Sequence, residues 1–391
     1  MRSFLSLCLL SVFALTIAPY AQMIAAEEAK DDMQENRYFS VDYAEARQRF
    51  LNAARLAKAD IESFQDTSLG QTEQLFIDVA LLGPADAENN LVLISGVHGV
   101  EGFGGSGIQV GLLREGVGEW LPPKTGLVMI HALNPYGFAN LRRFNEDNVD
   151  LNRNFLDHAG PYPENKGYDQ LSEALAPKSV SFAANTAAML RILWYRLWHG
   201  KSRLQQAVTQ GQYSYPQGLF FGGHAASWSN QILHDIVERH LAHAARVVMV
   251  DFHTGLGPYG YGEIVMNEPV GTPAYIRAVR WWGKERVKSM VTGESVSTNL
   301  SGTIPFALSR MLPDAEITAV GLEFGTSPPM DVFRAIRAEN WLHHHGGTDN
   351  RDAAKIKEQL LRAFYPDDDL WKSEVWEQGR SVVESVLKAD R

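Results

Sequence analysis

The sequence predicts a three-layer α/β/α domain built around a mixed, mostly parallel β-sheet. Short runs of Val, Ile and Leu alternate along the chain with longer segments whose apolar residues recur at helical spacing, an order typical of α/β proteins. Most of these runs lack polar alternation, as in strands that are buried on both faces. The chain has 391 residues, 45% of them hydrophobic. We therefore expect residues 27–391 to form one domain.

The individual elements follow from local patterns in chain order. Apolar runs rich in β-branched residues predict strands at 75–82, 91–97, 127–133, 246–252, 264–266 and 317–324. Apolar residues three and four apart predict helices at 42–59, after Gly104, at 180–210, 228–244 and 274–290, and on both sides of the YPDDD motif at 365–369. Residues 213–223 are rich in aromatic residues, Gly and Pro, which indicates a loop.

The first 26 residues have the form of a secretory signal peptide. Arg2 precedes an apolar stretch at 4–17 that is short for a membrane span, and small residues follow. Cleavage near Ala21 or Ala26 would place the mature chain in the periplasm or outside the cell, whereas an uncleaved anchor is the alternative. Cys8 is the only cysteine, so the mature chain would have no disulfide. Because cleavage removes the apolar stretch at 4–17, the mature chain would also have no membrane span.

The formal net charge is −10, and the sequence contains no long basic run. Nucleic acid and anionic membrane surfaces are attracted by clusters of positive charge. We therefore expect neither to be the main partner of this chain.

The stretch at 91–109 predicts half of a metal site. A buried strand runs into a Gly-rich turn that carries His98 and Glu101. A histidine and a glutamate three residues apart can direct a nitrogen and an oxygen at one point, and both are zinc ligands.

His253 is the candidate for a third ligand. It ends the apolar strand at 246–252 and precedes Gly255, where the backbone turns away from the ring. Asp251 could accept a hydrogen bond from a ligating imidazole. The alternative is an ordinary polar residue at a strand end.

Glu323 stands in the apolar segment AVGLEFG at 319–325. Burying a carboxylate without a partner is unfavourable. Either a cation pairs with it for structural reasons, or desolvation raises its pKa and makes it a general base.

The loop at 142–154 follows a predicted strand and is rich in arginine and asparagine. These residues are Arg142, Arg143, Asn145, Asn152, Arg153 and Asn154. Arginine forks bind carboxylates, and Arg143 could also stabilise an oxyanion. The alternative is a solvated loop with local Asp/Arg pairs.

His131 is expected to be a packed structural residue, and the run His343–His345 is expected to lie at the end of a helix.

Taken in order, these motifs resemble those of the M14 zinc carboxypeptidase family. The resemblance rests on the HxxE turn, NPYGF, VDLNRNF, the strand-end histidine and LEFG, and it covers residues from about 85 to 350. VDLNRNF is similar to the bacterial murein-peptide amidases of that family. SGVHGVEGF, DFHTGLGPYG, LEFGT and NWLHHHG resemble the DUF2817 branch.

The resemblance implies a zinc carboxypeptidase-like fold and a role for each matched residue. Zn²⁺ would be held by His98, Glu101 and His253, and Glu323 would be the general base and acid. Arg143 would polarise the scissile carbonyl. Asn152 and Arg153 would bind the terminal carboxylate of the substrate. The family also uses a tyrosine, for which Tyr259, Tyr261 and Tyr275 are candidates.

The function expected from this resemblance is that of an exported zinc-dependent hydrolase, a metallocarboxypeptidase-like enzyme that cleaves an amide bond next to a free carboxylate. Cell-wall peptides and other small peptides are reasonable substrates. One alternative is an N-acyl-amino-acid deacylase of aspartoacylase type, which uses the same metal chemistry. Another is a catalytically silent peptide-binding protein. The sequence does not predict an oligomeric state.

Overall fold

The computed structural model describes residues 38–67, 74–292, 300–346 and 350–389. The expected signal peptide at 1–26 lies outside these residues. Within them, no helix combines the length and apolar character needed to cross a bilayer.

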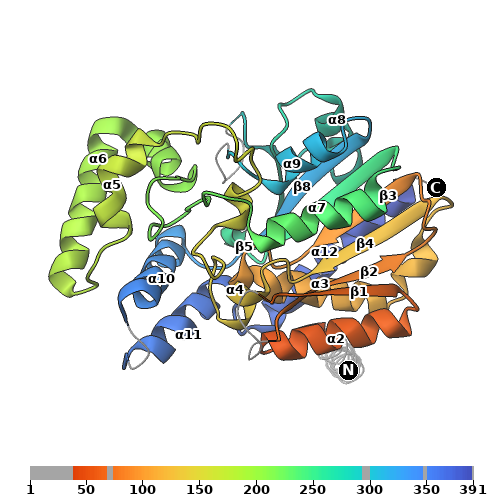
Figure 1. Ribbon diagram of the computed structural model, residues 1–391, viewed down its shortest axis with the longest axis horizontal. Coiled ribbons are helices and arrows are strands. Elements are labelled where there is room, and N and C mark those ends of the chain that lie inside the picture. Colours follow the sequence, from red (N-terminus) through yellow and green to blue (C-terminus); the bar gives the residue numbers. More distant parts are fainter. Residues whose placement is uncertain (1–37, 68–73, 293–299, 347–349, 390–391) are drawn as a thin grey trace, which may run out of the picture.

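An eight-stranded sheet forms the centre of the described chain, with the strand order β1-β2-β4-β3-β5-β8-β6-β7 (Figure 1). The strands are β1 (Asp60–Gln65), β2 (Phe76–Leu82), β3 (Asn89–Ile94), β4 (Thr125–His131), β5 (Arg246–Tyr259), β6 (Gly262–Met266), β7 (Val287–Ser289) and β8 (Glu316–Gly325). The pairs β3–β4, β3–β5, β5–β8 and β6–β7 are parallel, and the other three are antiparallel. The predicted mixed, mostly parallel sheet is therefore confirmed.

Alternate side chains of the central strands enter two different hydrophobic cores. Leu91 and Leu93 pack in one core, whereas Val92 and Ile94 pack in the other, as the period of a strand requires. The helices of the first core are α2 (Tyr43–Leu56), α3 (Gly102–Arg114), α8 (Pro273–Trp282) and α12 (Asp369–Ala389); those of the second are α7 (Trp228–Leu241) and α9 (Ile304–Met311). Helices on both faces of the sheet confirm the predicted three-layer α/β/α architecture.

Four further helices lie to one side of these layers. They are α5 (Lys166–Leu175), α6 (Phe182–Thr209), α10 (Pro329–Trp341) and α11 (Ala353–Phe364). In Figure 1, α5 and α6 lie at the far left, and α10 and α11 lie between them and the sheet. The shorter elements are α4 (Pro135–Ala139), η2 (Gly99–Glu101), η3 (Val117–Trp120), η4 (Leu151–Arg153) and η5 (Leu342–Gly346).

Two parts of the sheet depart from the predicted elements. β1 was not predicted, because this antiparallel edge strand has polar, partly exposed residues and no apolar run. The helix predicted at 274–290 ends at Trp282, where Gly283 adopts a positive φ of 84°, and β7 follows. Glycine reaches this conformation easily, so it could have marked the boundary.

Arg142 anchors the loop at 142–154 from inside the protein. Its Nε donates to Glu339 Oε1 of α10 at 2.8 Å, and a terminal nitrogen donates to Asn148 Oδ1 at 2.8 Å. Both side chains of the Arg142–Glu339 pair are 1% exposed. Lys357 donates to the same glutamate at 2.8 Å. This buried ion pair fixes the loop that leads to the candidate site.

Replacing Glu339 by alanine is expected to reduce the free energy of unfolding by about 3–5 kcal/mol, because the buried Arg142 would lose its counter-charge. Urea denaturation measures this effect. Glu358→Ala is the control, because Glu358 pairs with Arg362 on the surface, where the two side chains are 57% and 72% exposed. It is expected to cost less than about 1 kcal/mol. Equal losses in the two variants would contradict the anchoring role.

Candidate active site

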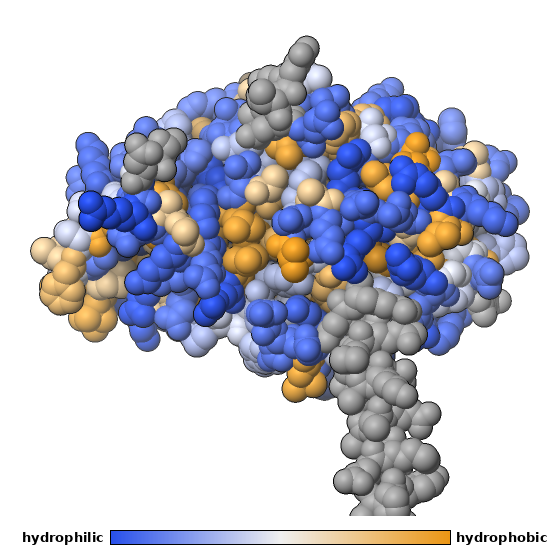
Figure 2. All heavy atoms as spheres, turned by 90° about the horizontal axis from the view of Figure 1, so that it is seen from below, coloured by the Kyte–Doolittle hydropathy of each residue, from blue (hydrophilic) through white to orange (hydrophobic). Residues whose placement is uncertain are grey.

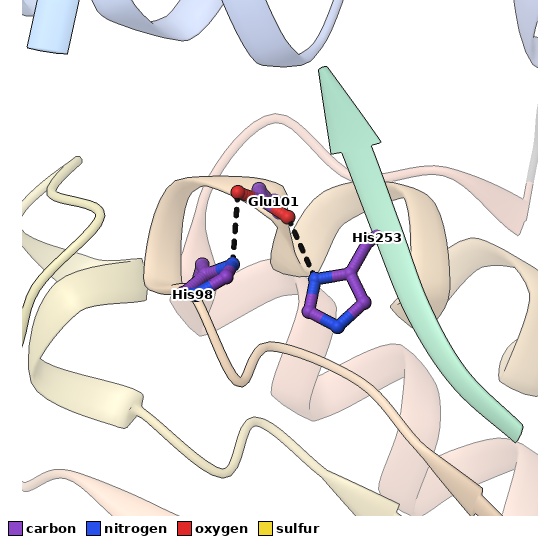
Figure 3. A group of neighbouring side chains, drawn as sticks. All are labelled: His98, Glu101 and His253. Carbon is purple, nitrogen blue, oxygen red and sulfur yellow. Dashed lines mark hydrogen bonds and ion pairs between the residues drawn. The ribbon is translucent and has the colours of Figure 1, made fainter. Parts of the chain in front are cut away.

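Three side chains with metal-ligating atoms meet beside the end of β3 and the middle of β5. His98 and Glu101 lie in the turn that follows β3, and His253 lies on β5 two residues beyond Asp251, the last residue that pairs with β3. Glu101 Oε1 lies 3.0 Å from His98 Nδ1, and Glu101 Oε2 lies 3.0 Å from His253 Nδ1. The three side chains are buried and point toward one another (Figure 3).

The turn reaches this position because its glycines allow close backbone packing. An added Cβ on Gly99 would overlap the backbone of Gly137 in α4. After His253, Gly255 adopts a φ of 140°, which residues with a side chain rarely do. The turn after β3 and the irregular part of β5 at Gly255 therefore lie where ligands from distant segments meet.

The geometry fits a divalent metal ion. Candidate ligand atoms of the three residues all lie within 4.8 Å of one another. His98 Nδ1 is buried and has no hydrogen-bond partner, despite its distance of 3.0 Å from Glu101. Two imidazole nitrogens and one carboxylate form a set that suits zinc and leave a position open for water or substrate.

An aspartate faces the other ring nitrogen of each histidine. Asp150 Oδ1 lies 3.1 Å from His98 Nε2, and Asp251 Oδ2 lies 2.6 Å from His253 Nε2. At His253, a proton on Nε2 donated to Asp251 would leave Nδ1 free to bind a metal. At His98, Nε2 faces a terminal nitrogen of Arg143 at 2.9 Å as well as Asp150, so the same tautomer requires this arginine N–H to point away from the ring. The contact of Asp251 was predicted. Asp150 was missed, although it stands two residues before Asn152 in the VDLNRNF motif.

The surrounding cations keep two of the acids ionised. Burial alone would raise the pKa of Glu101, but His98, Arg143 and His253 outweigh it and hold this pKa below its ordinary value. Burial opposes ionisation of Asp150 in the same way, and His98, Arg153 and Arg143 lower its pKa. Both groups are therefore carboxylates, as ligation and hydrogen-bond acceptance require.

Arg143 lies against the same cluster. One terminal nitrogen donates to Glu101 Oε1, and Nε lies 3.5 Å from Asp150 Oδ2. The side chain is 13% exposed and lines the adjacent cavity. Arg143 therefore presents a positive charge beside the candidate metal ligands.

Glu323 lies next to His253 on the adjacent strand. The parallel pairing of β5 with β8 aligns the two residues directly. Glu323 Oε1 accepts a hydrogen bond from the backbone N–H of Leu256 at 2.8 Å. Burial and, after it, the nearby Glu101 carboxylate together raise the pKa of Glu323 to about 7. Among the described residues, no ion pair joins Glu323 to a lysine or an arginine, so the structural pairing considered from the sequence is not seen.

Asn152 and Arg153 also reach the cavity. Asn152 Nδ2 lies 3.4 Å from His253 Nε2, and its Oδ1 accepts from the N–H of Ile304. The terminal nitrogens of Arg153 donate to the carbonyls of Asn152 and Thr209 at 2.8 and 2.6 Å. Its Nε is buried without a partner. These two bonds use two of the five N–H groups of Arg153, so donors remain for a bound anion.

A cavity of about 1340 Å³ adjoins these residues. Its lining includes His98, Arg143, His253 and Glu323, together with apolar residues of α6 and α10. Arg196 and Lys201 of α6 also line it. These contributions were not predicted from the sequence, because α6 precedes β5 by many residues and belongs to a separate group of helices.

The tyrosines considered as catalytic candidates lie elsewhere. Tyr259 donates to Asp368 at 2.5 Å, and Tyr275 packs in the core on α8. Neither of these residues nor Tyr261 lines the cavity. His131 is buried, contacts Ser106 Oγ at 2.9 Å and stacks on Phe50, and His343–His345 follow the end of α10. Both of these histidine groups have the predicted structural positions.

Comparison with known proteins adds a family and a set of distant structural relatives. A family model described as "Protein of unknown function (DUF2817)" matches residues 39–378. A search of curated proteins found no match.

Three solved structures illustrate the similarity of fold. Carboxypeptidase A from Helicoverpa armigera has a TM-score of 0.46 and 14% identity, over 84% of this chain and 75% of its own. Succinylglutamate desuccinylase from Chromobacterium violaceum has a TM-score of 0.37 and 16% identity, over 82% and 74%. Murein-tripeptide amidase from Escherichia coli O157 has a TM-score of 0.35 and 17% identity, over 79% and 93%. Such distant likeness does not extend an activity to this chain.

Proposed function

The chain belongs to the DUF2817 family, and from the geometry of its site we propose that it is a zinc-dependent hydrolase of amide bonds that lie next to a free carboxylate. One observation carries this proposal. His98, Glu101 and His253 converge within 4.8 Å of one another, and Glu323 is aligned with His253 on the next strand. A metal-ligand set beside a second carboxylate offers both a Lewis acid and a general base for hydrolysis.

His98 and His253 would hold zinc through Nδ1, and Glu101 would hold it through its carboxylate. When bound, zinc polarises a carbonyl oxygen and lowers the pKa of a bound water to about 7. Asp251 would keep His253 in the tautomer that ligation needs by accepting a proton from Nε2, and Asp150 would do the same for His98.

Glu323 takes a proton from the attacking water as the water oxygen adds to the amide carbon. Arg143 donates to the carbonyl oxygen as negative charge develops there. Glu323 then gives the proton to the leaving nitrogen as the C–N bond breaks, and the products are a carboxylic acid and an amine. A carboxyl group whose pKa lies near 7 suits both directions of proton transfer.

Arg153 and Asn152 would bind the free carboxylate of the substrate. Arg153 lines the cavity and keeps N–H groups without a partner, so a carboxylate bound there would accept a charge-assisted hydrogen bond from its guanidinium. Peptides and N-acyl amino acids both carry such a group, so the N-acyl-amino-acid deacylase remains the alternative activity.

A substrate panel read by mass spectrometry tests the proposal. Peptides with free C-termini and N-acyl amino acids would be incubated with zinc-loaded protein and with chelator-treated protein. Cleavage by the zinc-loaded form alone is expected, and the cleaved class identifies the activity. Undiminished hydrolysis without metal would overturn the mechanism. Tight peptide binding without product would instead indicate a catalytically silent binding protein.

Replacing Asp251 by asparagine is expected to weaken zinc binding by about 10–100-fold, because Asp251 orients His253 and increases its basicity. Competition with a chromogenic chelator measures this affinity. Asp235→Asn is the control, because Asp235 pairs with Arg239 on the exposed surface of α7. Unchanged affinity in Asp251→Asn would show that the short contact at His253 does not support a metal.

We also propose that the chain is exported and that zinc is bound in the periplasm or outside the cell. The support is the pattern of Arg2, the apolar stretch at 4–17 and the small residues that follow. Expression of the full chain in a bacterial host should give a periplasmic product that lacks the first 21–26 residues by intact mass. A full-length product in the cytoplasm would contradict this part of the proposal.

A further inference from the structure

Helix α6 has a hydrophobic face that is open to solvent. Leu190, Leu193, Trp194, Leu197 and Trp198 are each 48–75% exposed. Their spacing of three and four residues puts them on one side of the helix. Ala188, Ile192 and Tyr195, on the opposite side, are buried in a small core shared with α5. Hydrophobic residues gather at the left edge of Figure 2, the side on which α5 and α6 lie in Figure 1.

The charges around this face are positive, unlike those of the whole chain. Residues 166–209 contain six Lys and Arg residues and two acidic residues, whereas the chain has a net charge of −10. No acidic residue occurs within α6 itself. At the angular spacing of an α-helix, Arg191 and Arg196 flank the exposed apolar face on opposite edges. Arg191 contacts Glu173 of α5 at 2.8 Å, and that glutamate is 84% exposed.

The exposed apolar face with its basic flanks favours one type of binding partner. A second copy of the chain would bring the same basic flanks together, which like-charge repulsion disfavours. A bilayer with anionic lipids offers negative headgroups to the arginines and an apolar layer to the leucines, and tryptophan prefers the boundary between the two.

We propose that α6 is a membrane-docking helix, which lies in the surface of bilayers that contain anionic lipids. Ile192, on the inner side of the same helical stretch, lines the cavity, and Leu204 and Val208 line it beyond the break in α6 at Gly200, where φ is 84°. Docking would therefore hold the candidate active site next to the membrane. The proposal does not depend on hydrolysis, because binding to lipid can be measured without a substrate.

Cosedimentation of the whole protein with vesicles tests the docking. Binding is expected to vesicles of phosphatidylcholine and phosphatidylglycerol in equal parts, to be weak on phosphatidylcholine alone and to fall with added salt. The double variant Leu197→Glu/Trp198→Glu should lower binding by about tenfold or more. Leu56→Glu is the control, because Leu56, at the end of α2, is 71% exposed against 75% for Leu197.

All variants have the same N-terminal residues, so the apolar stretch at 4–17 contributes equally to their vesicle binding. A difference in binding between the double variant and the control is therefore due to α6. A circular dichroism melt shows whether the double variant is folded, and Leu190→Ser/Trp194→Ser repeats the test one turn earlier. Equal binding by the double variant and the wild type would overturn the proposal. Equal binding to neutral and anionic vesicles would also overturn it, as would a concentration-dependent dimer that the same substitutions abolish.

Discussion

Replacing Glu323 by glutamine is expected to lower kcat by about 10²–10⁴-fold and to leave zinc bound. The amide has nearly the shape of the carboxylate but cannot accept and return a proton, and this range is the usual contribution of general acid–base catalysis. Glu323 is not among the clustered candidate ligands, so the metal content should stay near that of the wild type. Steady-state kinetics on the substrate found in the panel, together with metal analysis, measure both quantities.

Glu316→Gln is the matched control, because it makes the same change on the same strand. Glu316 begins β8, where it pairs with Arg246 and Arg277 on the surface, far along the strand from Glu323. Its kcat should match that of the wild type. If Glu323→Gln kept more than a tenth of the wild-type kcat while fully loaded with zinc, another group would have to be the base.

The fold could be predicted because buried strands and amphipathic helices leave strong periodic patterns. The strands β3, β4, β5 and β8 were all predicted from apolar runs, since each lies in the interior of the sheet. β1 and β7 lie at the two edges. An edge strand has a neighbour on one side only and does not need a continuous apolar run, so its sequence carries little signal.

The candidate site was partly predictable for a similar reason. His98, Glu101, His253 and Glu323 stand at or near the ends of predicted strands, and the carboxyl ends of parallel strands meet at one edge of a sheet. Local sequence does not show how segments that are distant along the chain are placed relative to one another. The hydrogen bond from Arg153 to the carbonyl of Thr209 at 2.6 Å and the packing of α6 along the cavity depend on tertiary structure alone.

Arg142 and Arg143 show how far neighbouring residues can differ in role. They are adjacent in a loop rich in charged and amide residues, and the sequence does not distinguish them by composition. In the structure, Arg142 forms a buried ion pair with Glu339. Arg143, by contrast, lies against Glu101 and lines the cavity. From the sequence, the oxyanion role considered for Arg143 and its match to a family motif were what separated the two.

Replacing His253 by alanine is expected to lower zinc affinity by more than about 100-fold and to abolish measurable hydrolysis. Losing a partner of a ligand already costs about 10–100-fold, and losing the ligand itself removes a direct bond to the metal. The wild type should contain about one zinc per chain after purification, by elemental analysis, and the variant should contain almost none. Chelation of the wild type should reproduce the inactivity of the variant, and added zinc should restore the wild type alone.

His234→Ala controls for the general loss of a histidine. His234 lies on α7 and contacts the carbonyl of Asn230 at 2.9 Å, away from Glu101 and His253. It should keep both zinc and activity. If His253→Ala retained stoichiometric zinc, the ion would have to be held by other residues, and the convergence of His98, Glu101 and His253 would reflect the packing of polar groups instead of a metal centre. The ratio of zinc to protein in the two variants separates these outcomes even before a substrate is known.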